Sequence, residues 1–303
     1  MRTLLIDGNN TCFQALGKAP LHYNGQRTEV IKIALGMVRS YIEKFQPDIA
    51  IVAWDGGRDE RRTSIYPDYK RKKREWTEDE KAEREILFEQ MRQLMPVFTS
   101  LGLQQFKVKG REGDDLIFTL LCKGWVLDGE QIVVSTDQDM FQLFSYSSQV
   151  FIYSPIRKLI INADYVEQEF GIQSKDFAFY KAMVGDGSDN LPGIHGIGPK
   201  KAQQVMDAYR GGHNEYGHKL LEQVLNNEEE LTKQMTLVTL MAIPDEEIVA
   251  GHHWSQGFKE DEVLQALEKY GLVQFLERYS DWSAPFIQMQ QRNRVVGTWE
   301  VSK

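Results

Sequence analysis

Short apolar runs alternate with helical patterns along this chain of 303 residues. The runs have the length of single strands and cover residues 3–6, 49–54, 103–108, 131–136, 149–153 and 158–161. Apolar residues at helical spacing lie between them, over 30–45, from 77 onward, over 114–125 and over 139–144. Such alternation predicts an α/β fold in which a mainly parallel sheet is covered by helices on both faces.

Acidic residues lie where these predicted strands end and again further along the chain. They form five clusters: Asp7; Asp55; Glu112, Asp114 and Asp115; Asp137 and Asp139; and Asp186 and Asp189. A single Asp is usually a helix cap or a turn residue, but the strand ends of an open α/β sheet meet at one crevice. Carboxylates gathered there repel one another unless a cation compensates. Because oxygen ligands select magnesium or manganese over zinc, the pattern predicts a hard-metal site.

The second signal is a glycine-rich segment over residues 190–202, Asn-Leu-Pro-Gly-Ile-His-Gly-Ile-Gly-Pro-Lys-Lys-Ala. Its glycines allow a tight turn with free backbone amides, and its second proline opens the next helix. We interpret it as a helix-hairpin-helix at about 190–206, which would hold the backbone of duplex DNA without reading bases. The alternative is an ordinary Gly-Pro turn between helices. The expected phosphate contacts are Gly196, Gly198, Lys200 and Lys201.

A basic segment over residues 57–76 is the third signal. It carries eight basic and four acidic residues, with Tyr66, Tyr69 and Trp76 between them. Basic groups for phosphates and aromatic faces for bases are typical of sequence-tolerant binding to a single strand. The alternative is a solvated helix face.

The net charge of −8 at first argues against a nucleic-acid partner, because such domains are usually basic. The clustered carboxylates account for this charge, and bound cations would leave a positive path for phosphates elsewhere. No apolar run approaches the roughly 20 residues of a membrane span, so we expect a cytoplasmic protein with no membrane partner. The Cys and His spacings fit no zinc site, and the absence of a Gly-x-x-x-x-Gly-Lys-Ser/Thr loop argues against an NTPase.

Six short motifs follow one another in a fixed order. They are Leu-Ile-Asp-Gly-Asn at 5–9, Trp-Asp at 54–55, Tyr-Pro-Asp-Tyr-Lys at 66–70, Glu-Gly-Asp-Asp at 112–115, Ser-Thr-Asp-Gln-Asp at 135–139 and Gly-Asp-Gly-Ser-Asp-Asn-Leu-Pro-Gly at 185–193. In this order the chain resembles the 5′ nuclease family, which includes flap endonucleases, bacteriophage 5′ exonucleases and the 5′ nuclease domain of bacterial DNA polymerase I. The resemblance covers about residues 3–210, and the motifs are specific because all of them occur together.

The resemblance implies a PIN-like α/β fold with a helical arch and a helical C-terminal region that contains the hairpin. We therefore expect a nuclease domain over residues 1–175, with the arch at about 57–100, and a DNA-binding region over 176–303. The segment at 135–139 lacks the glycine that the bacterial polymerase type has before its first Asp, which makes the chain more similar to phage members.

The same resemblance implies a divalent-metal-dependent phosphodiesterase, acting as a structure-specific 5′-3′ exonuclease and flap endonuclease in DNA replication or repair. Two or more Mg²⁺ or Mn²⁺ ions are its expected cofactors, and hairpins of this family often hold K⁺ through backbone carbonyls. The expected substrate is DNA with a free 5′ end, flap or nick. An RNA–DNA hybrid or an RNA primer stays open, since nothing in the sequence senses a 2′-hydroxyl. We expect a monomer in a bacterial cytoplasm or a phage-infected host.

Position by position, the resemblance assigns roles to single residues. All nine clustered carboxylates would hold metals directly or through water. The catalytic residues would be Lys70 near the scissile phosphate, Tyr69 beside it and Arg62 ahead of it. The residues expected to face DNA are Lys72, Lys73, Arg74, Lys181, Gly196, Gly198, Lys200 and Lys201. The rival hypothesis keeps the fold as a catalytically weak, structure-specific DNA-binding protein, although every ligand position is filled.

Overall fold

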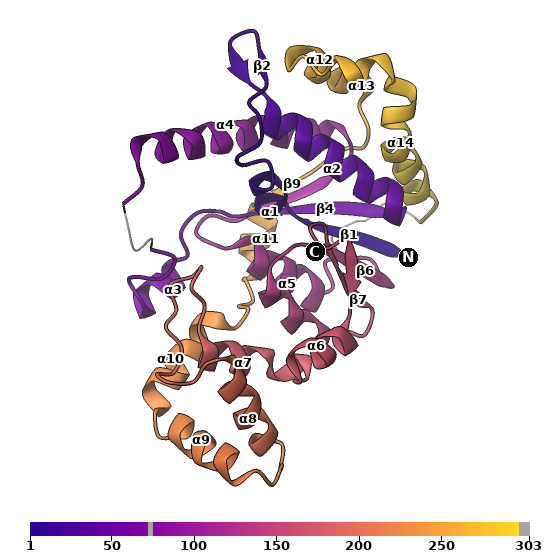
Figure 1. Ribbon diagram of the computed structural model, residues 1–303. Helices are drawn as coiled ribbons and strands as arrows, with labels where there is room; N and C mark the ends of the chain where they lie inside the picture. Colours follow the sequence, from indigo (N-terminus) through magenta and orange to yellow (C-terminus); the bar gives the residue numbers. More distant parts are fainter. Residues whose placement is uncertain (72–74, 297–303) are drawn as a thin grey trace.

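Seven strands form the central sheet of the structure, a computed structural model that describes residues 1–71 and 75–296 (Figure 1). They are β1 (Arg2–Asp7), β4 (Ile49–Trp54), β5 (Gln104–Lys107), β6 (Glu130–Val134), β7 (Val150–Ser154), β8 (Leu159–Ile161) and β9 (His252–His253), in the order β8-β7-β6-β1-β4-β5-β9. The five inner strands are parallel, and the edge strands β8 and β9 run antiparallel to their neighbours. The expectation of a mainly parallel sheet is confirmed.

Helices cover both faces of this sheet (Figure 1). One face carries α2 (Glu29–Phe45), α4 (Glu78–Ser100), α12 (Glu260–Lys269), α13 (Val273–Glu277) and α14 (Tyr279–Val296). The other carries α5 (Gly113–Cys122), the 3₁₀-helix η1 (Gln138–Ser145), α6 (Ala163–Phe170) and α7 (Phe177–Val184). Side chains alternate along a strand, so Leu4 and Ile6 of β1 lie in the first core while Leu5 lies in the second.

The remaining elements lie around these layers. They are α1 (Gly8–Phe13), the small hairpin β2 (His22–Tyr23) and β3 (Gln26–Arg27), α3 (Glu60–Ile65), η2 (Ser174–Asp176), α8 (Pro199–Tyr209), α9 (Glu215–Leu225), α10 (Glu228–Val238) and α11 (Asp245–Ala250). Helix α8 packs on α7 and α9, and α10 packs on α7 and α3. Helices α8–α10 form the hairpin region, which contains the expected helix-hairpin-helix. Through α10, this region contacts the basic segment over residues 57–76.

The carboxyl ends of β1, β4 and β6 lie side by side. Asp7 is paired with Ala53 of β4, and Ile6 is paired with Val134 of β6. Strand β1 lies between β4 and β6. The chain first adds β4 and β5 on one side of β1, and then crosses to the other side to form β6. A reversal of strand order of this kind leaves a crevice outside the carboxyl ends of the strands, where three of the five acidic clusters begin.

The last helices do not stay with the hairpin region. Helices α12 and α14 contact α4 and α2, and β9 pairs with β5. Val263, Trp282 and Phe286 are buried in the core above the sheet. The boundary expected near residue 175 therefore does not hold for residues 252–296, because the apolar faces of these helices complete the core over α2 and α4.

One local expectation also changes: the helix expected over 139–144 is the 3₁₀-helix η1. The arch segment expected at 57–100 contains α3 and α4. Lys72, Lys73 and Arg74 lie outside the described residues. No helix within 1–71 and 75–296 is long and apolar enough to cross a membrane.

Candidate active site

Three carboxylates stand at the ends of three adjacent strands. Asp7 ends β1 and caps α1, accepting a hydrogen bond from an amide of that helix at 2.9 Å. Asp55 follows β4 and accepts from the first amide of α5 at 2.7 Å. Asp137 follows β6 and caps η1, with a 2.9 Å hydrogen bond. Capping fixes the orientation of each carboxylate. The same residues can therefore cap a helix and face the crevice.

A second acidic group brings together residues that lie far apart in the sequence. Single carboxylate oxygens of Asp139, Asp186 and Asp189 all lie within 4.8 Å of one another. Asp139 comes from η1, and the other two come from the turn after α7. In that turn the backbone groups of Asp186 and Leu191 pair with each other, with N···O distances of 2.9 and 2.7 Å. The spacing is that of a cation site with oxygen ligands.

The basic segment reaches the acidic crevice through Lys70 and Tyr69. The ammonium of Lys70 lies 2.8 Å from Glu112 Oε1 and 3.9 Å from Asp189 Oδ2. The hydroxyl of Tyr69 lies 3.0 Å from Glu112 Oε2 and 3.2 Å from Asp189 Oδ2. Lys70 has a left-handed backbone (φ +54), held by its amide donating to the Asp189 carbonyl at 2.8 Å. This sparsely populated conformation is typical of a functional site.

Asp7, Asp139 and Glu112 hold their protons more tightly than usual. Burial raises the pKa of Asp7 to about 8, with Asp55 and Asp137 adding to the shift. Burial and Asp137 raise the pKa of Asp139 to about 8. Burial, helped by a neighbouring carboxylate, raises the pKa of Glu112 to about 7. Such shifts mean that the ionised forms need a compensating cation.

The donor set fits a hard divalent cation. Carboxylate oxygens are the ligands that Mg²⁺ and Mn²⁺ prefer. Within the described residues, no donor has hydrogen-bond geometry at the buried Oδ1 of Asp139, although Lys181 Nζ lies 3.0 Å away. This oxygen therefore keeps a lone pair that a cation could take. Asp114, in the first turn of α5, is half-buried, and one of its oxygens accepts a hydrogen bond from the Asp115 amide.

Arg62 is not at the crevice surface. Its side chain is 2% exposed, and all five of its N–H groups have protein acceptors. Nε donates to the Leu237 carbonyl at 3.0 Å and Nη2 to the Thr239 carbonyl at 3.1 Å. The other three hydrogens go to Asp115, at 2.6 and 3.0 Å, and to Asp59, at 3.3 Å. The expected contact of Arg62 with a reacting phosphate therefore does not fit this structure, because no donor is left for it.

Asp115 faces the same ion pair and not the crevice. Its side chain is fully buried, Oδ1 accepts from Arg62 and from the Met241 amide, and Oδ2 accepts from Arg61 and Arg62. These four hydrogen bonds use the acceptor positions of the carboxylate. The ligand role expected for Asp115 therefore does not fit either, whereas the other eight carboxylates remain candidates.

The aromatic residues of the basic segment are engaged with the protein. Tyr69 is buried, Tyr66 lies under the ammonium of Lys233 at 4.8 Å, and Trp76 lies under the guanidinium of Arg84 at 4.7 Å. The expectation that these rings stack on bases is thus not supported by their placement.

The lysines expected to face DNA are placed in two different ways. Lys181 is buried and forms ion pairs with Asp139 and Asp186 at 3.0 and 2.5 Å. Lys200 is exposed in the first turn of α8, two residues after the cap Gly198. Lys201 donates to the Gly196 carbonyl at 2.9 Å. Gly196 has φ +80, so the turn requires its glycine.

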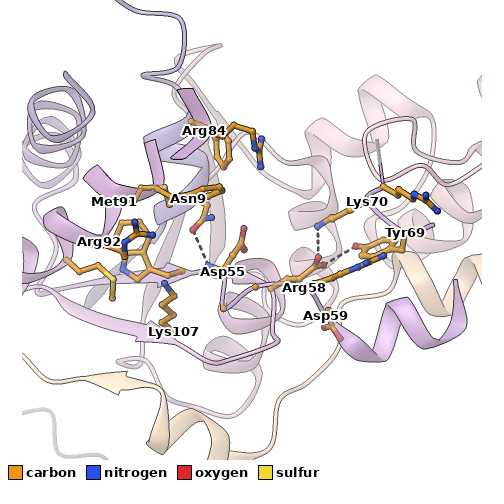
Figure 2. Close-up of a pocket in the computed structure, with 18 residues that line it drawn as sticks. Asn9, Asp55, Arg58, Asp59, Tyr69, Lys70, Arg84, Met91, Arg92 and Lys107 are labelled. Atoms are coloured by element: carbon orange, nitrogen blue, oxygen red, sulfur yellow. Dashed lines mark hydrogen bonds and ion pairs between the residues drawn. The ribbon is translucent and has the colours of Figure 1, made fainter. Parts of the chain in front are cut away.

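A cavity of about 710 Å³ connects the crevice with α4. Figure 2 shows Lys70 and Tyr69 on one side of it, Arg92 on the other, Asp55 between them and Arg84 above Asp55. Sequence reasoning missed Asn9, whose side-chain carbonyl accepts from the Asp55 amide at 3.1 Å, and the two arginines of α4. Asn9 lies in the Asp-Gly-Asn motif, which was the available signal.

Comparisons with known proteins identify relatives of this chain. The family model for the 5′-3′ exonuclease, N-terminal resolvase-like domain, matches residues 2–171. The 5′-3′ exonuclease of Aquifex aeolicus is 28% identical over 69% of this chain and 70% of its own length. Flap endonuclease Xni of Shewanella amazonensis is 29% identical over 71% of this chain and 80% of its own.

A longer relative is DNA polymerase I of Lactococcus lactis, 28% identical over 90% of this chain. The chain spans about a third of the length of that polymerase, 32%. Among solved structures, T5 5′-exonuclease with bound zinc matches with a TM-score of 0.64 and 22% identity, over 89% of this chain and all of that one. Flap endonuclease-1 from Methanococcus jannaschii matches with a TM-score of 0.58 and 14% identity, over 97% and 93%. These two likenesses show the fold. Because the family model covers more than half of the sequence, the chain belongs to the family of the 5′-3′ exonuclease N-terminal, resolvase-like domain.

Proposed function

We propose that this protein is a structure-specific 5′-3′ exonuclease and flap endonuclease that hydrolyses DNA phosphodiester bonds in replication or repair. The observation that carries the proposal is the set of carboxylates at the ends of three neighbouring strands and in the group of Asp139, Asp186 and Asp189, with the Lys70 ammonium at Glu112. The substrate is DNA with a free 5′ end, a flap or a nick, and an RNA–DNA hybrid is an alternative 5′ strand. The protein acts as a monomer in a bacterial cytoplasm or a phage-infected host.

Two groups of residues would hold the divalent ions, Mg²⁺ or Mn²⁺. The first group is Asp7, Asp55, Asp114 and Asp137, and the second is Asp139, Asp186 and Asp189. Glu112 lies beside Lys70 and could serve either group. When bound, divalent ions supply an activated water and stabilise the attacking and leaving oxygens of an in-line displacement.

The side chains of the chain itself would position the phosphate. Lys70 is 43% exposed on its side chain, so its ammonium can turn from Glu112 to a phosphate oxygen and offset the charge that develops there. Burial opposes its charge, but Glu112 outweighs burial and raises the pKa of Lys70 well above its usual value, so the group stays protonated. Tyr69 holds the Glu112 carboxylate in place. The products would carry 5′-phosphate and 3′-hydroxyl ends.

Duplex DNA would be held by the turn before α8. Lys200 and the amides at Gly196 and Gly198 would contact backbone phosphates without reading bases. K⁺ is a further candidate ligand of the carbonyls in this turn. Lys72, Lys73 and Arg74, outside the described residues, would contact the 5′ strand.

Cleavage of a 5′-labelled flap on duplex DNA, with Mg²⁺, with Ca²⁺ and with EDTA, tests the proposal. We expect release of the flap at or near the junction with Mg²⁺ only. Lys70→Met should lower kcat roughly 10²- to 10³-fold, the usual cost of one lost stabilising charge. Lys259→Met is the matched control, because Lys259 is 40% exposed and pairs with Glu262 at the start of α12, outside the crevice. Tight binding without cutting in Mg²⁺ or Mn²⁺ would instead establish the DNA-binding alternative.

A further inference from the structure

The Lys181 ammonium occupies part of the second acidic group. It comes from α7 and lies 2.5 Å from Asp186 Oδ2 and 3.0 Å from Asp139 Oδ1. Both oxygens belong to carboxylates that converge with Asp189 within 4.8 Å. The lysine side chain is only 9% exposed, so its charge is directed into the acidic group and not toward solvent.

The two acidic groups differ in what holds their carboxylates. In the second group the Lys181 ammonium pairs with both Asp139 and Asp186. In the first group Asp7, Asp55 and Asp137 accept hydrogen bonds from backbone amides, and no ion pair joins them to a Lys or Arg among the described residues.

We propose that the Lys181 ammonium competes with the divalent cation that would bind Asp139, Asp186 and Asp189. This second group then binds its ion more weakly than the first group, and only after the ammonium moves away. The inference rests on the proposed function, because it assumes that both groups bind divalent ions. An ammonium that pairs with two of these carboxylates competes with a divalent ion for them, since like charges in a partly buried site repel. Lys181 therefore acts as a positioning residue that makes occupation of the two groups sequential.

Metal binding to the full chain, measured without DNA, tests this inference. Free Mn²⁺ is counted by electron paramagnetic resonance during a titration at pH 8, and Ca²⁺ binding is followed by calorimetry. We expect a tighter and a weaker class of sites in the unmodified protein. Lys181→Met should tighten the weaker class roughly tenfold or more, about 1.4 kcal/mol, and should leave the tighter class within about twofold.

Three variants make the result specific. Lys181→Arg keeps the charge and should retain the weaker class. Lys175→Met removes an exposed lysine six positions earlier and should change neither class. Asp186→Asn should remove the weaker class. Two classes that stay unchanged in Lys181→Met would overturn the inference, whereas failure of the unmodified protein to bind any Mn²⁺ would overturn the proposed function.

A measurement on the unmodified protein covers the case in which Lys181→Met does not fold. The NH₃⁺ groups of ¹⁵N-lysine are observed by NMR, and the Lys181 signal is assigned by its loss in Lys181→Arg. We expect this buried, ion-paired signal to shift or disappear as Ca²⁺ fills the weaker class, and to stay in place while the tighter class fills. A signal that is unaffected at Ca²⁺ saturation would contradict displacement of the ammonium.

Discussion

The guanidinium of Arg62 has no hydrogen left for a substrate phosphate, since Asp59, Asp115 and two backbone carbonyls accept all five. The two carbonyls belong to Leu237, in the last turn of α10, and to Thr239, the residue that follows this helix. Arg62 therefore joins the start of the basic segment, the first turn of α5 and the end of α10. Its role is structural, and it reaches the acidic crevice through an ion pair with Glu112, with Nη1 lying 3.2 Å from Oε2.

Replacement of Arg62 tests this role. Arg62→Met leaves the buried carboxylate of Asp115 without its main partner, and loss of one member of a buried pair typically costs about 3–5 kcal/mol. Urea unfolding in metal-free buffer should show this loss. Arg71→Met, at an exposed ion pair, should change the free energy of unfolding by less than about 1 kcal/mol. Unchanged stability with a raised KM for a flap substrate would instead support a phosphate contact.

The raised pKa values of the crevice predict how stability depends on pH. Asp7 and Asp139 (about 8) and Glu112 (about 7) bind protons in the folded state that the unfolded chain, with pKa values near 4, has already released. The folded state thus holds more protons between about pH 5 and 8. In EDTA, the free energy of unfolding should fall as pH rises through this window.

Divalent ions should weaken this pH dependence. They bind the ionised carboxylates and replace the protons, so stability in saturating Mg²⁺ should change less between pH 5 and 8. The lowered pKa of Asp186, about 2, has the opposite effect and stabilises the folded state. This stabilisation is lost only at pH values more acidic than this range. Denaturation curves at pH 5, 6.5 and 8 measure both effects, and a metal-free protein that gains stability across this range would contradict the interpretation of the crevice.

At the scale of elements, the turn between α7 and α8 depends on two glycines that face each other. Gly185 has φ +80 and Gly193 has φ +68. A Cβ on Gly185 would lie 2.7 Å from Gly193 N, and a Cβ on Gly193 would lie 2.5 Å from Gly185 N. Only glycine allows this close approach. The turn in turn places Asp186 and Asp189 at the crevice and leads into α8.

Lys200 gives the test for this element. Because Lys200 is exposed at the start of α8, Lys200→Ala should weaken binding to all duplex sequences alike. The slope of log K against log salt should become shallower by about one unit, as expected for one lost phosphate contact. Lys219→Ala, which removes an exposed lysine of α9 paired with Glu215, is the control and should leave the slope unchanged. A loss that depends on DNA sequence would mean that this turn reads bases.

At the scale of the whole molecule, the chain returns to its first half after the hairpin region. Figure 1 shows α12, α13 and α14 beside α2 and α4, far from α8 and α9. Arg39 of α2 donates to the carbonyls of Asp281 and Trp282, at 3.0 and 3.1 Å. The C-terminal helices are therefore part of the fold that supports the crevice, and not a separate DNA-binding unit.

Truncation of a buried side chain in α14 tests this packing. Phe286 is fully buried in the core above the sheet, and Phe286→Ala should cost about 3–5 kcal/mol in the free energy of unfolding. Val273→Ala in α13 is the control, because Val273 is 53% exposed and its truncation should cost about 0.5 kcal/mol or less. A loss for Phe286→Ala as small as that of the control would mean that α14 is not part of the cooperative unit.

The sequence by itself determined the layers of the fold, the acidic strand ends and the position of the hairpin. These features are local: strand and helix periods, caps and glycine turns depend on residues within a few positions of each other. The capping box of α4, formed by Thr77 and Glu80, is a local feature of this kind. Residues 283–303 follow no clear helical period, so the helix α14 is apparent only in the structure.

Only the tertiary structure decided which charged residues face the crevice. Asp114 and Asp115 are neighbours in one motif, yet Asp115 is turned to Arg61 and Arg62, 54 and 53 residues earlier. Arg62 donates two of its hydrogens to carbonyls 175 and 177 residues away. Lys181 pairs with Asp139 of η1. A side chain's role depends on which donors and acceptors its distant neighbours leave free, and chain folding alone sets those neighbours.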